Sequence, residues 1–108
     1  PYDEAAPGAV GLQTLLPALL GFHHEGRIPL MDLMRTVTSR PAELLGLPAG
    51  RLAKGAPADL VLCDLNAPMI VDLADLKSKS KNSPFDGRRL QGVVRMTLVD
   101  GRVVYQAD

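Results

Sequence analysis

Few side chains in this sequence could do chemistry: two adjacent histidines, one cysteine, and two aspartates that flank an apolar run. His23 and His24 lie on an expected helix, where neighbours point about 100° apart and cannot share a metal ion as an i, i+4 pair can. Cys63 lies inside the apolar run, which indicates a small core residue rather than a nucleophile. Asp59 and Asp64 bracket that run, too far apart for paired acid and base catalysis, so we expect them to end a strand.

The sequence also lacks a Ser/His/Asp arrangement, a phosphate-binding P-loop and a dinucleotide-binding glycine pattern. We therefore predict no catalytic residue and no metal ligand in these 108 residues, and we expect the chain alone to bind no zinc and to be inactive. Twelve basic residues balance twelve acidic ones, which gives no electrostatic footprint for nucleic acid or an anionic membrane. The single cysteine excludes an internal disulfide and favours a cytoplasmic location.

The first half has helical periodicity. The leucines of this half have the i, i+3, i+4 spacing of an amphipathic helix: Leu12, Leu15, Leu16, Leu19 and Leu20. We expect Gly26 to end this helix. Pro17 is compatible with this helix only near its first turn. A second helical pattern covers residues 30–37, and Ser39 with Pro41 should begin a third helix that ends at Gly46.

The second half has the pattern of strands. Leu60 to Cys63 is a compact apolar run, typical of a strand buried on both faces. Val93–Val99 and Val103–Tyr105 flank Asp100-Gly101, a dipeptide typical of a two-residue hairpin turn. Between these strands, the polar stretch from Lys77 to Gly87 is expected to be a solvated loop whose three lysines are surface charge.

Three segments carry a resemblance to a known family. The first is Ala6 to Thr14, which opens the first helix; the second is Gly50 to Leu65, with the pattern G-x-L-x-x-G-x-x-A-D-L-V-L-x-D. The third is the polar stretch Ser78 to Gly87 together with the strands that follow it. Together they resemble the C-terminal quarter of the dihydroorotases, cyclic amidohydrolases of the metal-dependent amidohydrolase superfamily. Gln13 departs from the Glu that is more usual in the family.

The resemblance implies an α/β parent protein with a (β/α)₈ TIM barrel and a small β-sandwich. Residues 1–48 would be the last loop and helices of the barrel, and residues 49–108 the C-terminal strands of the sandwich. The family binds zinc, but its His-x-His pair and catalytic Asp have no counterpart here, so zinc would belong to the rest of the parent. Because the chain opens at Pro1 without an initiator Met, we expect it to be part of a longer protein.

The same resemblance implies a hydrolase of pyrimidine biosynthesis that interconverts carbamoyl aspartate and dihydroorotate. The family loop that matches Pro7 and Gly8 lies beside the substrate, so these two are the candidate substrate-binding residues. Proline has no N–H, which leaves the Gly8 N–H as the donor. We expect the Asn82 to Gly87 element to help the tail return toward the barrel rather than to touch substrate.

Other functions stay open at this point. Allantoinases share much of the third segment, although they more often carry Tyr where Phe85 stands, and other cyclic-amide hydrolases are possible. The parent could also be a metal-free dihydroorotase-like subunit that supports aspartate carbamoyltransferase, or a homodimer. An autonomous β-rich binding module is disfavoured, because the apolar helices need a barrel on which to pack.

Overall fold

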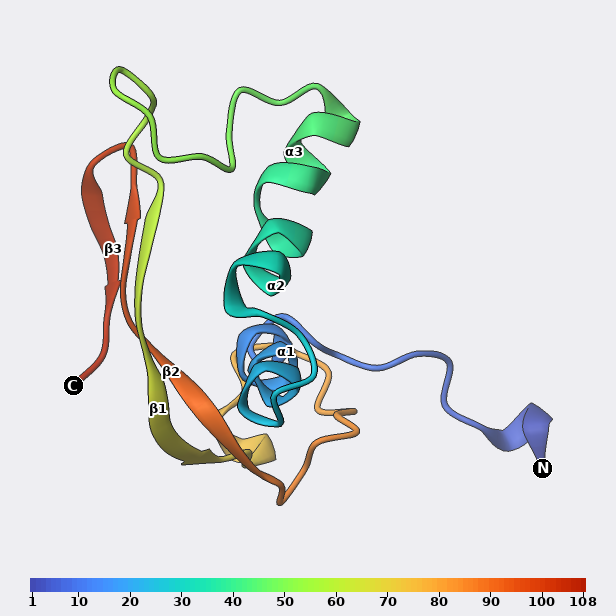
Figure 1. Cartoon of the computed structure of the whole chain (residues 1–108). Coiled ribbons are helices and arrows are strands. Elements are labelled where there is room, and N and C mark those ends of the chain that lie inside the picture. The colour runs from blue at the N-terminus through green and yellow to red at the C-terminus, as the bar shows by residue number, and fades with distance from the viewer.

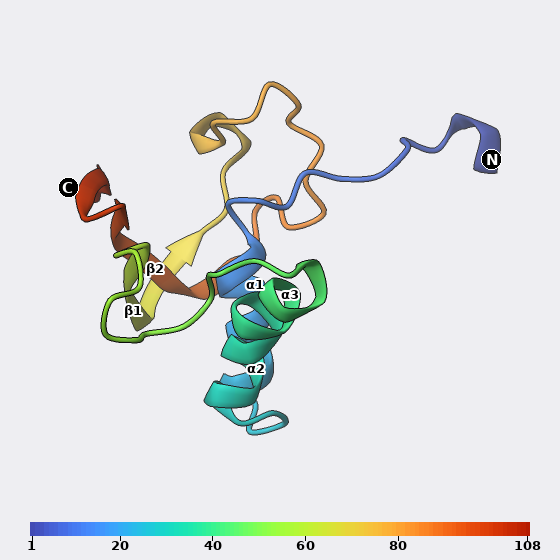
Figure 2. The same ribbon diagram turned by 90° about the horizontal axis from the view of Figure 1, so that it is seen from above.

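The computed structural model describes residues 1–108 and contains three α-helices followed by three strands (Figure 1). Two short 3-10 helices, η1 (Tyr2–Glu4) and η2 (Leu73–Asp75), precede α1 and β2 respectively. The main elements are α1 (Leu15–His24), α2 (Leu30–Val37), α3 (Ser39–Leu45), β1 (Leu60–Ile70), β2 (Arg89–Val99) and β3 (Arg102–Gln106). The helices lie to one side of the sheet, and the N-terminal segment extends away from both (Figures 1 and 2).

The helix ends agree with the sequence predictions. At the end of α1, Gly26 has φ +71°, its N–H donates to the His23 carbonyl, and the Arg27 N–H donates to the Phe22 carbonyl. This pair of bonds is a Schellman motif, which needs a left-handed residue and therefore favours glycine. Pro17 occupies the first turn of α1, and α3 begins at Ser39 and ends beside Gly46, as predicted. All three helices are confirmed, but α1 begins at Leu15, so Leu12, which was predicted to belong to it, lies outside the helix and is exposed.

The strands form one antiparallel sheet in the order β1-β2-β3. The predicted hairpin is confirmed: Val99 pairs with Arg102, while Asp100 (φ 50°) and Gly101 (φ 75°) form the turn. Positive φ at both turn residues gives the twist that a two-residue hairpin needs. The Asp59 carboxylate accepts a hydrogen bond of 2.8 Å from the Asp100 N–H and so ties this turn to the start of β1. The chain provides one sheet, so the sandwich stays a prediction.

The prediction of a short strand buried on both faces was wrong. β1 runs eleven residues, and Val61 and Leu62 are 58 % and 60 % exposed. Cys63 is half-buried rather than a core residue. No other part of this chain covers the outer side of β1. The apolar residues at its start, whose pattern is typical of a fully buried strand, are therefore exposed to solvent.

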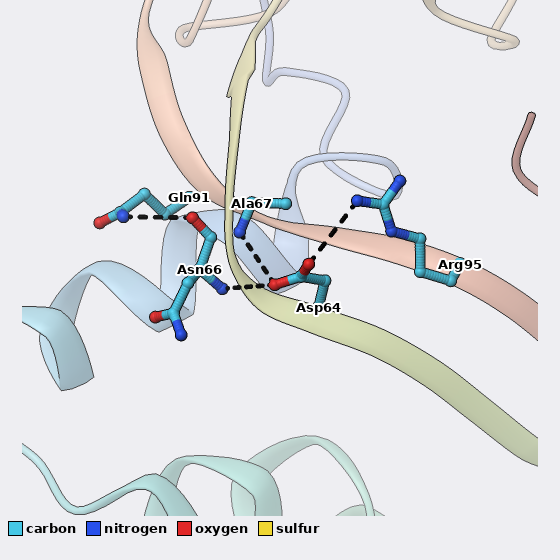
Figure 3. Close-up of polar contacts among 5 residues, drawn as sticks. All are labelled: Asp64, Asn66, Ala67, Gln91 and Arg95. Carbon is cyan, nitrogen blue, oxygen red and sulfur yellow. Dashed lines mark hydrogen bonds and ion pairs between the residues drawn. The ribbon is translucent and has the colours of Figure 1, made fainter.

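Asp64 does not end the strand as predicted; it stabilises a bulge within it (Figure 3). One carboxylate oxygen accepts hydrogen bonds from the N–H groups of Asn66 (3.0 Å) and Ala67 (3.1 Å), and the other lies 3.6 Å from the Arg95 guanidinium. The sheet register shifts between Asp64 and Pro68, and Pro68 can be accommodated because β1 is an edge strand of this sheet. The Asn66 hydrogen bond, aided by the Ala67 amide and Arg95, holds the pKa of Asp64 below its usual range.

Replacing Asp64 with Asn should lower the melting temperature at neutral pH, and this loss should fade in acid. A lowered folded-state pKa contributes stability above the ordinary aspartate pKa of about 3.9, and this contribution disappears as the pH falls through the lowered value. Melting temperatures measured from roughly pH 7 down to pH 3 test this. Asp86→Asn is the matched control, because the exposed Asp86 carboxylate makes no hydrogen bond or ion pair. A difference from wild type that is the same at every pH would contradict the assignment.

α1 is fastened to the sheet at two points. Leu20, which has no exposed surface, packs on β2 at Gly92, where an added Cβ would overlap the Leu20 side chain. The Nε2 atom of His24 lies 2.9 Å from the Leu65 carbonyl on β1. The helical and sheet halves of the chain are therefore joined through α1, while α2 and α3 extend beyond it (Figure 1).

The buried apolar core is small and consists of Leu20, Leu33, Ala42, Val71 and Leu76. Many other large apolar side chains are exposed, among them Leu12, Leu44, Leu52, Val103 and Tyr105. This distribution is typical of a unit with surface that other protein covers. None of its helices has the length and apolar character to span a membrane.

Candidate functional site

The candidate substrate-binding residues, Pro7 and Gly8, lie in the extended segment that leads into α1. Both are exposed, and Gly8 has φ +78° with open space around the position where a Cβ would stand. The Gly8 carbonyl accepts a hydrogen bond of 2.6 Å from the Asn82 side chain, whereas the Gly8 N–H makes no hydrogen bond within the chain. An exposed, unpaired N–H beside a rigid proline is a donor that a ligand can use.

The segment is held by the polar loop between η2 and β2. Besides the Asn82 contact with Gly8, the Val10 N–H donates to the Asn82 carbonyl at 2.9 Å. Gln13 accepts a hydrogen bond of 2.5 Å from the Lys77 N–H, and its Nε2 lies 3.4 Å from the Asp75 carbonyl. The Lys77–Gly87 stretch is largely exposed, as predicted, but it also fixes the segment before α1. The expectation that the Asn82 to Gly87 element helps the tail return toward the barrel stays a prediction.

His23 and His24 lie next to each other near the end of α1. Their ring centroids are 5.4 Å apart, both side chains are half-buried, and His24 is engaged with the Leu65 carbonyl. No group of three or more His, Cys, Asp or Glu side chains is placed to hold a metal ion. The residues of this chain therefore do not form a zinc site by themselves.

A hollow of about 770 Å³ lies between α1 and residues 85–91, and neither Pro7 nor Gly8 lines it. Arg27 stacks over the Phe22 ring at 5.2 Å on one wall, and Arg88 stacks over the Phe85 ring at 5.6 Å on the other. Its one carboxylate, Glu25, lies 3.7 Å from Arg27. His24 also lines the hollow, and its Nε2 already lies 2.9 Å from the Leu65 carbonyl.

A family model described as the amidohydrolase family matches residues 9–105, nearly the whole chain. The chain belongs to the amidohydrolase family. This amidohydrolase chain is 45 % identical over 108 residues to a dihydroorotase of Ehrlichia chaffeensis and 48 % identical to one of Anaplasma phagocytophilum. Each alignment covers all of the chain and 24 % of the relative, so the chain spans about a quarter of the length of the curated relatives that it matches. The predicted resemblance to dihydroorotases is confirmed.

Solved structures of hydantoinases are also similar to the chain. The amidohydrolase chain is similar to an L-hydantoinase (dihydropyrimidinase) from Arthrobacter aurescens, with a TM-score of 0.90 and 37 % identity. It also resembles a D-hydantoinase with a TM-score of 0.87 and 28 % identity. Both alignments cover 97 % of the chain and 24 % or 23 % of the solved structure. The arrangement of three helices and a small sheet therefore also occurs within these larger hydantoinase structures.

Proposed function

We propose that this chain is the C-terminal part of a dihydroorotase, a zinc hydrolase that interconverts carbamoyl aspartate and dihydroorotate in pyrimidine biosynthesis. The observation that carries the proposal is the 45 % to 48 % identity to proteins named dihydroorotase over the entire chain. Hydantoinase structures match the fold with TM-scores of 0.87 and 0.90 but are only 28 % and 37 % identical to the chain. Residues 1–48 would complete a TIM barrel, and residues 49–108 would join a β-sandwich in the complete, cytoplasmic enzyme.

In this proposal the chain contributes groups that bind the substrate and none that take part in the reaction. Dihydroorotate hydrolysis breaks the ring C–N amide bond and adds one water molecule to give carbamoyl aspartate. Pro7 and Gly8 would lie beside that ring, where the unpaired Gly8 N–H donates a hydrogen bond to a substrate oxygen. Since this chain offers no metal cluster, the zinc and the groups that move protons would be provided by the remaining three quarters of the enzyme.

The second candidate is a different cyclic-amide hydrolase, because the L-hydantoinase structure aligns with a TM-score of 0.90 at 37 % identity. Both candidates open a ring amide and differ in the substituents of that ring. Dihydroorotate carries a carboxylate that hydantoin and allantoin lack, so the two are separated by substrate preference rather than by reaction type.

The test is a substrate comparison with the purified full-length protein that carries this chain. We expect kcat/KM for dihydroorotate to exceed that for hydantoin, dihydrouracil and allantoin by at least a hundredfold, a margin typical of sites that pair a substrate's polar group. We also expect bound zinc in that protein, and neither zinc nor turnover in the isolated 108-residue chain. A preference for hydantoin or allantoin would favour the second candidate. Absence of turnover, with co-purification of aspartate carbamoyltransferase, would identify a non-catalytic subunit.

A further inference from the structure

Asn82 joins two segments that are 74 positions apart in the sequence. Its side-chain Nδ2 donates to the Gly8 carbonyl at 2.6 Å, and its backbone carbonyl accepts from the Val10 N–H at 2.9 Å. Asn82 thus hydrogen-bonds to the backbone on both sides of Ala9, once as a donor and once as an acceptor. Such a paired contact fixes both the position and the direction of the backbone that it holds.

Nothing else in the chain supports this part of the segment. Residues 1–9 are all exposed, and the position beside the Gly8 Cα has no atom within 4 Å. The next contact between this segment and the loop before β2 is made by Gln13, whose side chain accepts a hydrogen bond from the Lys77 N–H at 2.5 Å. Without the Asn82 side-chain contact, the Val10 hydrogen bond to the Asn82 backbone would remain, but the backbone at Gly8 would have to be ordered when a ligand binds, and that ordering weakens binding.

We propose that Asn82 is a positioning residue for the substrate loop, because its side-chain amide holds the Gly8 carbonyl and thereby presents the unpaired Gly8 N–H in a fixed place. Asn82 acts through Gly8 and does not itself touch the substrate. The inference rests on the proposed function, in which the Gly8 N–H donates to the bound cyclic amide. It adds a residue whose role is to order the donor before the substrate arrives.

Steady-state kinetics of the full-length enzyme with dihydroorotate test this role. Asn82→Ala should raise KM about fivefold while kcat stays within about twofold, since the lost contact orders the binding loop and takes no part in the reaction. Asn82→Asp keeps the shape but replaces the amide donor with a carboxylate oxygen, so it should not restore KM. Restoration by Asp would show that Asn82 only fills space and would overturn the inference. The matched control is Asn66→Ala, because the exposed Asn66 side chain makes no hydrogen bond.

A double-mutant cycle shows whether Asn82 acts through Gly8. In a Gly8→Val background, Asn82→Ala should change KM less than twofold, because the donor that it orders is already displaced. An additional fivefold loss in that background would mean that Asn82 acts elsewhere. Hydrogen exchange measured by mass spectrometry should also be faster for residues 8–13 in Asn82→Ala than in Asn66→Ala, and unchanged exchange would contradict the contact.

The outcomes separate the two proposals. If the wild-type enzyme does not turn over dihydroorotate, the proposed function is wrong and this inference falls with it. If the wild-type enzyme is active and both Asn82 variants keep its KM, only the positioning role is wrong.

Discussion

Replacing Gly50 with Ala is expected to lower the free energy of unfolding by about 3 kcal/mol. Gly50 has φ +75°, where a residue with a Cβ is strained by about 1 kcal/mol or more. A Cβ at this position would also overlap the Thr38 carbonyl and lie 3.1 Å from the Ser39 N atom. These are backbone atoms at the α2–α3 junction, so they cannot rotate away as a flexible side chain could. Denaturant unfolding of the full-length protein measures the loss.

Gly55 provides the matched control, because it also has positive φ (+84°) but has no atom within 4 Å of the Cβ position. Gly55→Ala should therefore show the backbone strain alone, about 1 kcal/mol. The difference between the two variants isolates the close approach of Gly50 to Thr38. Equal losses would show that α2 and α3 move aside freely. The first glycine of the G-x-L-x-x-G segment would then need another explanation.

Features encoded by neighbouring residues could be predicted from the sequence. Gly26 ends α1 and Asp100-Gly101 forms the hairpin turn because positive φ at those positions is a local requirement that the residue types reveal. The same holds for α3, whose start at Ser39 and end beside Gly46 follow from local helix chemistry. The presence of three helices and three strands could be predicted without knowing which elements pack together.

Features that depend on distant residues could not be predicted. β1 continues past Asp64 to Ile70 because residues 68–70 pair with residues 89–91 of β2, which lie about twenty positions further along the chain. Read locally, an aspartate after an apolar run is a stop signal. The exposure of Val61 and Leu62 likewise depends on what covers the sheet, and an apolar run does not reveal this.

In the candidate site, too, some residues could be predicted from the sequence and others could not. Pro7 and Gly8 were proposed from a family resemblance, and φ +78° at Gly8 gives a physical reason for the glycine there. No periodicity or spacing could have linked Gly8 to Asn82, because their contact depends on the fold returning the loop before β2 to the segment before α1. The polar composition of the loop before β2 predicted only that the loop is exposed to solvent.

Replacing Gly8 with Val should lower kcat/KM for dihydroorotate in the full-length enzyme at least tenfold, equivalent to about 1.4 kcal/mol of transition-state stabilisation. A branched side chain is strained at φ +78°, so the backbone would rotate and carry the N–H away from the substrate. There is open space around Gly8, so within this chain the variant can fold without a clash. Steady-state kinetics, zinc content and melting temperature together measure the effect, and zinc content should not change.

Gly26→Val separates loss of the donor from loss of stability. Gly26 has nearly the same φ, +71°, and the same open surroundings, but it ends α1 and lies outside the Pro7-Gly8 segment. The two variants should therefore lower the melting temperature by similar amounts, since each forces a β-branched residue into the left-handed region. Only Gly8→Val should lower kcat/KM. If Gly26→Val reduces kcat/KM equally, strain rather than the Gly8 N–H controls activity; if neither variant changes it, Gly8 is a turn residue with no contact to substrate.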